Sequence, residues 1–195
     1  MTQRIKIAHY NAGNIASVMN ALGRLGVRGE LATSPEDIKT ADKLIFPGVG
    51  HAKPAMELLR SKGMDQAIKD FQGPVLGICL GMQLMAESSE EGNMQGMSIF
   101  PESIKLFTGR SKIPHMGWNS LHALKGPLFD KIDEGCYVYF VHSYYMPSSE
   151  LSIAGCDYEG RFTAAIARDN FFGVQFHPEK SGETGMTILK NFIKL

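Results

Sequence analysis

Hydrophobic residues in the first half of the chain alternate between short apolar runs and stretches of helical spacing. An apolar run at 5–9 is followed by a stretch whose apolar side chains recur every three or four residues and which ends at Gly26. Those side chains are Ile15, Val18, Met19, Leu22 and Leu25. The same order of strand then helix recurs at 43–46 and 55–59, and again at 74–79 and 82–87. Alternation with short connections predicts a parallel sheet flanked by helices.

The second half has a different pattern, because strand-like segments separated by turn residues follow one another. They span 103–107, 136–145, 152–158, 162–168 and 171–176. Asp169-Asn170 predicts a hairpin turn, and a final helix is expected at 183–194, with Met186, Leu189, Phe192 and Ile193 on one face. We therefore expect one α/β domain over residues 1–195, with a mixed, largely parallel central sheet flanked by helices and an added antiparallel region.

Composition narrows the class of protein further. The chain has 195 residues, of which 44% are hydrophobic, and its 20 Lys and Arg balance its 20 Asp and Glu. A net charge of zero without a basic run argues against nucleic-acid and membrane-surface partners. The three cysteines lack the paired spacing of a zinc site, and no apolar leader or span of 18 apolar residues occurs. These features predict a soluble, cytoplasmic protein.

The clearest local motif is Gly77-Ile78-Cys79-Leu80-Gly81, which follows an apolar strand and precedes a helix. It is a nucleophile elbow with sulfur in place of oxygen. The glycines allow a sharp turn that presents Cys79 to the first N–H groups of the helix, where a thiol is activated as a nucleophile. The alternative is that Cys79 is a small buried hydrophobic residue at the end of a strand.

A nucleophilic thiol needs a base, and one of the six histidines lies in a suitable segment. His177 ends the apolar run 173–176 and is followed by Pro178 and Glu179. If Pro178 holds the backbone extended, Glu179 accepts a hydrogen bond from the imidazole and fixes its tautomer. The alternative is an exposed turn after a strand. Of the other histidines, His142 is expected to be a hydrogen-bonded structural residue, and His51 adjoins the loop at 48–50.

Two features carry a family resemblance: Cys79 is followed four residues later by Gln83, and residues 175–179 are Gln-Phe-His-Pro-Glu. With these features the whole chain resembles the class I glutamine amidotransferases, which have a flavodoxin-like fold. Three further segments resemble one subfamily, the glutaminase subunits of histidine biosynthesis. They are Phe46-Pro47-Gly48-Val49-Gly50, Ile113-Pro114-His115-Met116-Gly117-Trp118-Asn119, and Tyr139-Phe140-Val141-His142-Ser143-Tyr144. One departure is His9-Tyr10-Asn11, where the subfamily usually has Asp-Tyr-Gly.

The motif residues suggest a reaction. We expect the Cys79 thiolate to attack the side-chain amide of glutamine, with Glu179 supporting His177 as acid and base. The oxyanion needs two donors: the backbone N–H of Leu80, and one from the loop at Val49 and Gly50, whose glycines allow a peptide plane to reorient. For that loop alone, a plain strand-to-helix turn is the alternative.

The resemblance implies several further roles. Gly48, Gln83, Ser143 and Tyr144 would hold the glutamine, and the ammonia would pass to a (β/α)8-barrel synthase subunit in a heterodimer. The residues that would form the partner interface and ammonia gate are Asn14, Trp118, Tyr139 and Lys180. Neither a metal nor an organic cofactor is implied on this chain.

Three other functions compete with this one. Another class I glutaminase, such as the subunit that serves pyridoxal phosphate synthase, has similar length and the same cysteine and His-Pro-Glu elements. A Cys-elbow hydrolase or redox sensor of related architecture would not require Gln83 and His-Pro-Glu in this order. A degenerate binding subunit would have lost its chemistry, although Cys79, His177 and Glu179 are present.

Overall fold

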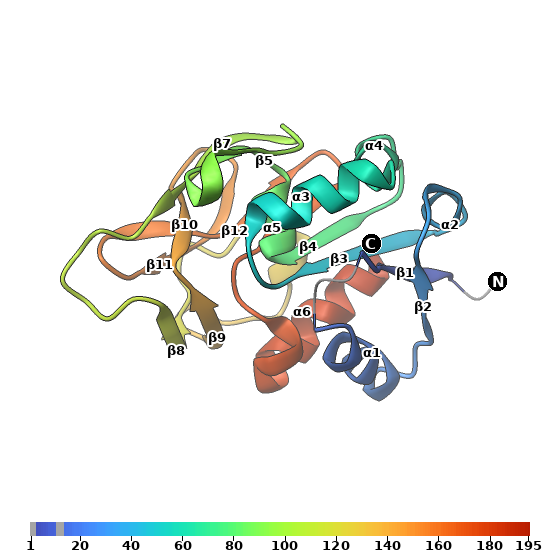
Figure 1. Ribbon diagram of the computed structural model, residues 1–195. Coiled ribbons are helices and arrows are strands. Elements are labelled where there is room, and N and C mark those ends of the chain that lie inside the picture. The colour runs from blue at the N-terminus through green and yellow to red at the C-terminus, as the bar shows by residue number, and fades with distance from the viewer. Residues whose placement is uncertain (1–2, 11–13) are drawn as a thin grey trace.

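A computed structural model of the chain describes residues 3–10 and 14–195 (Figure 1). Five neighbouring strands of its main sheet are parallel: β2 (Gly29–Ala32), β1 (Ile5–Ala8), β3 (Lys43–Gly48), β4 (Val75–Cys79) and β13 (Phe171–Val174), in that spatial order. The strands β1, β3 and β4 are nearly continuous apolar runs, because both of their faces are covered, whereas the edge strand β2 exposes its two central residues. The parallel sheet predicted from the first half is confirmed.

Antiparallel strands extend this sheet beyond β13. The order continues through β12 (Arg161–Arg168), β10 (Tyr144–Pro147), β7 (Phe100–Leu106), β5 (Ala86–Ser89) and β6 (Met94–Gln95), with β11 (Ser152–Asp157) also paired to β12. Within this part only β5 and β7 are parallel neighbours. A separate two-stranded sheet consists of β8 (His115–Ser120) and β9 (Tyr137–His142).

Helices cover both faces of the parallel strands, as Figure 1 shows. On one face, α3 (Ala52–Ser61), α4 (Met64–Lys69) and α5 (Leu80–Leu84) share an apolar cluster with α2 (Pro35–Lys39). On the other face, α1 (Ile15–Arg24) and α6 (Gly182–Lys194) share a second cluster with Ile5, Ile7 and Ile78 of the sheet. No helix in the ranges 3–10 and 14–195 is long and apolar enough to cross a membrane.

Some predicted elements have different limits in the structure. The helix expected at 82–87 begins at Leu80 and ends at Leu84, and Ala86 starts β5. The strand expected at 136–145 is divided at Ser143 into β9 and β10, which belong to different sheets. The hairpin turn at Asp169-Asn170 is confirmed, since Arg168 pairs with Phe171.

Several elements had not been predicted at all. They are β2, α2, α4, β5, β6 and β8, together with the short 3-10 turns η1 (Glu91–Asn93), η2 (Pro127–Phe129) and η3 (Pro178–Lys180). The start of α2 carried a recognisable signal: the Ser34 hydroxyl and the Asp37 carboxylate form a reciprocal capping box around Pro35.

Candidate active site

Three adjacent parallel strands end at the same edge of the sheet. Gly48, the last residue of β3, pairs with Cys79, the last residue of β4. On the other side of β4, β13 leads through Gln175 to His177. Ligands of open α/β sheets bind at the carboxyl ends of the strands, so the topology brings together segments that lie far apart in the sequence.

Cys79 occupies a strained turn between β4 and α5. Its φ of 54° and ψ of −110° are rare for a residue with a side chain. A Cβ on Gly77 would lie 2.3 Å from Met85 Cε, and one on Gly81 would lie 1.8 Å from the carbonyl oxygen of Phe46. The two glycines therefore let the elbow pack directly against β3 and α5, which holds Cys79 at the helix N-terminus.

His177 is held by its backbone as well as by its side chain. Its N–H donates to the carbonyl of Tyr139 at 2.9 Å, and its own carbonyl accepts from the Ser181 hydroxyl at 2.6 Å. The imidazole Nδ1 lies 2.8 Å from Glu179 Oε1, and the two side chains are only 2% and 1% exposed. Carboxylate and imidazole thus form a buried pair, joined by the hydrogen bond that was expected from the sequence.

The backbone achieves this pairing differently from the prediction. His177 itself is extended, as the residue before a proline tends to be. Pro178 is not extended but opens the 3-10 turn η3. That turn brings the carboxylate of Glu179 back toward the ring that precedes it by two residues.

The electrostatics of the pair favour a charged imidazole. Burial lowers the pKa of His177, but its interactions with Cys79 and Glu179 more than offset burial and raise that pKa to about 10. Within the described part of the chain, His177 Nε2 is buried without a hydrogen-bond partner. An imidazolium with a free Nε2–H is suited to pairing with a thiolate and to protonating a leaving group.

Cys79 and His177 border a pocket of about 560 Å³. Six of the other predicted site residues line it: Val49, Gly50, Leu80, Gln83, Ser143 and Tyr144. Gly48 does not line this pocket but lies beneath it, where a Cβ would be 2.7 Å from Tyr10 Oη and 2.8 Å from the Gly81 nitrogen. Gly48 therefore lets β3 pack closely against the elbow.

The loop after β3 and the start of α5 frame one end of this pocket. Leu80 is the first residue of α5, so its backbone N–H has no acceptor within the helix. Gly50 has a φ of +95°, a conformation that other residues rarely adopt, and Val49 is 43% exposed. Beneath the loop, the buried Tyr10 hydroxyl donates to the Pro47 carbonyl at 3.2 Å. Burial and the proximity of Cys79 raise the pKa of Tyr10.

Two residues of the site were missed by sequence reasoning. Gln175 is buried, and its Nε2 donates to Cys79 Sγ at 3.7 Å. Its position two residues before His177 was the available signal, since alternate residues of an extended segment share a face. Glu91 lines the pocket from η1 and accepts a hydrogen bond from the Ala52 N–H at 2.8 Å. His51 Nδ1 lies 3.1 Å from the other oxygen of this carboxylate.

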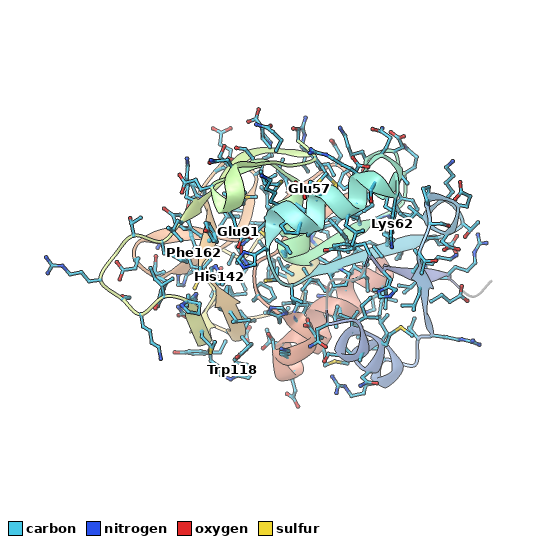
Figure 2. All side chains as sticks on the ribbon, viewed as in Figure 1. Glu57, Lys62, Glu91, Trp118, His142 and Phe162 are labelled. Atoms are coloured by element: carbon cyan, nitrogen blue, oxygen red, sulfur yellow. The ribbon has the colours of Figure 1, made fainter. Side chains whose placement is uncertain are left out.

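Three of the predicted interface residues lie together on another face. The rings of Trp118 on β8 and Tyr139 on β9 meet edge to face with centroids 6.2 Å apart, and Lys180 Nζ lies 5.9 Å from the centre of the Tyr139 ring. Trp118 is 55% exposed and lies at the periphery of the molecule (Figure 2). The fourth residue, Asn14, precedes α1, a helix that contacts η3.

Asn11 and its neighbours 12–13 lie outside the described residues, so the unusual His9-Tyr10-Asn11 segment is described only in part.

The residues just described match a known class of protein. Residues 8–195 match the model of the family described as glutamine amidotransferase class-I. The chain therefore belongs to the class I glutamine amidotransferases.

Curated relatives refine this assignment. The chain is 52% identical over 195 residues to the imidazole glycerol phosphate synthase subunit HisH of Bacteroides fragilis strain YCH46, with 98% of this chain and 100% of the relative covered. It is 44% identical over 194 residues to the protein of the same name from Escherichia coli strain K12, with 98% and 99% covered. The resemblance to this subfamily is confirmed.

Solved structures bear out the fold. A putative GMP synthase subunit from Thermoplasma acidophilum matches with a TM-score of 0.78 at 19% identity, covering 100% of this chain and 94% of that one. A chain of the PurLQS structure from Thermotoga maritima matches with a TM-score of 0.74 at 16% identity, covering 100% and 99%. At such identities the likeness concerns the fold alone.

Proposed function

We propose that this chain is the glutaminase subunit of an imidazole glycerol phosphate synthase. It acts as one domain, hydrolyses L-glutamine to glutamate and ammonia, and delivers the ammonia to a synthase subunit. The observation that carries the proposal is the placing of Cys79, on a strained elbow, beside the buried His177–Glu179 pair at one pocket. Relatives that are named as this subunit, and that match along almost their whole length, favour this function over that of the pyridoxal phosphate synthase glutaminase and over a redox sensor.

In the first half of the reaction, the Cys79 thiolate attacks the side-chain amide carbon of glutamine. The C=O π electrons move to oxygen, and the oxyanion receives hydrogen bonds from the Leu80 N–H and from the loop at Val49 and Gly50. When the intermediate collapses, the C–N bond breaks, and the His177 imidazolium donates its Nε2 proton to the departing ammonia. A thioester on Cys79 and a neutral His177 remain.

The second half returns the enzyme to its starting state. Neutral His177 takes a proton from water, whose oxygen attacks the thioester carbon, and the C–S bond then breaks. The new γ-carboxyl group loses its proton to solvent, and the product leaves as glutamate. The Cys79 thiolate and the His177 imidazolium are restored together. Glu179 stabilises the positive ring at the start and at the end of the cycle and fixes its orientation.

The pocket suits the zwitterionic end of glutamine as well as its amide. Glu91 supplies a carboxylate at the wall of the pocket, where it takes the α-ammonium group. Both hydrogens of Gln83 Nε2 are engaged, with the Tyr144 carbonyl at 3.1 Å and with Gln175 Oε1 at 2.8 Å. Gln83 therefore offers its carbonyl oxygen to the substrate, and Ser143 offers a hydroxyl.

The partner binds, in this proposal, at the face that carries Trp118, Tyr139 and Lys180. A (β/α)8-barrel synthase subunit would cover it, forming a heterodimer, with Asn14 at the margin. An exposed tryptophan beside a tyrosine is typical of an interface anchor. We place the complex in the cytoplasm, because the mechanism needs Cys79 as a free thiolate.

The test is glutamate release from glutamine by the purified chain, alone and mixed with a barrel synthase subunit loaded with a nucleotide substrate analogue. We expect strong stimulation by the loaded partner and no release by the Cys79→Ala variant. High activity without any partner would indicate another glutaminase. No activity in either condition would contradict the proposal.

A further inference from the structure

A chain of hydrogen bonds runs through the protein from β8 to the sulfur of Cys79. It begins at Asn119, whose Nδ2 lies 3.3 Å from His115 Nε2. His115 Nδ1 lies 3.0 Å from His142 Nε2, and His142 Nδ1 lies 2.7 Å from the Tyr144 carbonyl oxygen. The same carbonyl accepts from Gln83, whose amide also meets that of Gln175.

The direction of each of these hydrogen bonds is determined by groups that can only donate or only accept. A carbonyl oxygen only accepts, so His142 Nδ1 carries a hydrogen and its Nε2 accepts in the neutral ring. His115 Nδ1 must then donate, and His115 Nε2 accepts from the Asn119 amide. That amide is oriented independently, since its Oδ1 accepts from the Ser120 N–H at 2.8 Å.

Both imidazoles are neutral, in agreement with these directions. Burial lowers the pKa of His142 to about 3 and that of His115 to about 4. A second proton on either ring would place two N–H groups against each other. Aromatic side chains enclose both imidazole rings. The ring centroids of His142 and Phe162 lie 5.3 Å apart, and Figure 2 shows the two side chains next to each other. His115 stacks on Tyr158 with ring centroids 4.0 Å apart.

The Tyr144 carbonyl also determines the orientation of the two amides on its other side. Because it only accepts, the Gln83 atom that faces it is Nε2. The atom of Gln175 that faces Gln83 Nε2 is then its oxygen, which leaves Gln175 Nε2 directed at Cys79 Sγ. An N–H donor stabilises a thiolate more than a thiol.

We propose that His115 and His142 are positioning residues for glutamine hydrolysis: they hold the Tyr144 carbonyl, which orients Gln83 and Gln175 so that an amide N–H is directed at the nucleophilic sulfur. The inference deepens the proposed function and rests on it for the identity of the substrate. It gives a role to the histidine of the segment at 113–119 and to His142, which the sequence pattern marked only as structural.

The decisive variant is His142→Phe, which keeps an aromatic ring among Phe107, Phe140 and Phe162 but leaves the Tyr144 carbonyl without its second donor. The readout is the rate of alkylation of Cys79 by iodoacetamide as a function of pH, followed by mass spectrometry of the Cys79 peptide. We expect the pH of half-maximal rate to rise by about half a pH unit, the effect of one weakened hydrogen bond to the thiolate.

Two further variants separate orientation from packing. His142→Asn retains an N–H near the position of Nδ1 and should recover most of the wild-type profile. Leu121→Ala removes a buried side chain of the same apolar cluster that takes no part in the chain of hydrogen bonds, so it lowers stability without moving the profile. If His142→Phe does not fold, His115→Phe replaces it, because it removes the Nδ1 donor to His142.

The proposal is overturned if the histidine-to-phenylalanine variant keeps the wild-type alkylation profile. It is also overturned if Leu121→Ala or His142→Asn shifts the profile by the same amount, since the effect then follows packing. Alkylation needs neither glutamine nor a partner. A chain that fails to hydrolyse glutamine but shows the expected shifts would therefore disprove the proposed function and leave the orienting role of the histidines standing.

Discussion

Glu179 shows how much of the site depends on a single buried carboxylate. Its Oε1 lies 2.8 Å from His177 Nδ1, and the interaction is one of the causes that raise the pKa of His177 to about 10. A group whose pKa is higher in the folded than in the unfolded protein adds stability at low pH. That contribution is complete below about pH 6.5 and is lost as the pH rises through about 10.

Glu179→Gln removes this charge while conserving the shape of the side chain. We expect the variant to be less stable than the wild type by about 2 kcal/mol at pH 6, the usual worth of a hydrogen bond to a charged group. The difference should shrink as the pH approaches 10, because the wild-type imidazole then loses its proton. Urea unfolding of both proteins at pH 6, 8 and 10 measures it.

The same substitution should lower kcat for glutamine by at least about 10²-fold, because the ring loses its orienting acceptor. Cys79→Ala gives the background of the activity assay, since it removes the nucleophile and leaves the His177–Glu179 hydrogen bond in place. A loss of stability in Glu179→Gln that is the same at every pH would contradict the assignment of a buried charged pair.

At the scale of the element, the elbow and the loop beside it depend on glycine for two different reasons. Gly81 has no room for a side chain, because its Cβ would lie 1.8 Å from the Phe46 carbonyl oxygen. Gly50 has open space, with nothing within 4 Å of its Cβ position, but its φ is +95°. Gly23, exposed in α1, is restricted by neither space nor an unusual φ.

Alanine at each of the three positions should therefore have a different effect. Gly81→Ala should lower the free energy of unfolding by more than about 3 kcal/mol, because β3 and α5 must separate. Gly50→Ala should cost about 1–2 kcal/mol and lower glutaminase activity. Gly23→Ala should stabilise by about 0.5–1 kcal/mol through helix propensity. Equal losses in the first two, with activity retained in Gly50→Ala, would contradict this account.

Sequence patterns predicted the strands that are buried on both faces and the helices that bury one face. The apolar runs of β1, β3 and β4 and the helical spacing of α1 and α6 are of this type. The pattern was misleading at 82–87, where Met85 and Ala86 continue the apolar residues of α5 as far as the first residue of β5. It also gave no sign of the change of sheet at Ser143, since β9 and β10 are similar in composition.

The site was predictable where a motif is local and unpredictable where the tertiary structure assembles it. Cys79 on its elbow and Glu179 beside His177 are set by neighbours within a few residues. Glu91 enters the pocket from a 3-10 turn, and nothing in its own segment marks it. Gln175 gains its role only because Gln83, 92 residues away, orients its amide.

For the whole molecule, the structure separates the pocket from the face proposed for the partner. The small sheet of β8 and β9 spans the two: Trp118 and Tyr139 lie on its exposed side, and His115 and His142 on its buried side. The buried side reaches the Tyr144 carbonyl within the pocket. A partner protein bound to the exposed side would therefore contact the same small sheet whose buried side supports the proposed glutamine site.

Trp118→Ala should weaken binding of the barrel synthase subunit without unfolding the chain. The side chain is 55% exposed, so little buried area is lost from the free protein, whereas truncation of an aromatic anchor costs an interface about 2 kcal/mol or more. That cost is about a 30-fold rise in Kd, measurable by titration calorimetry. Leu31→Ala is the control, because Leu31 is 43% exposed on β2, at the opposite end of the molecule (Figure 1). Unchanged affinity in Trp118→Ala, or an equal loss in Leu31→Ala, would place the partner on another face.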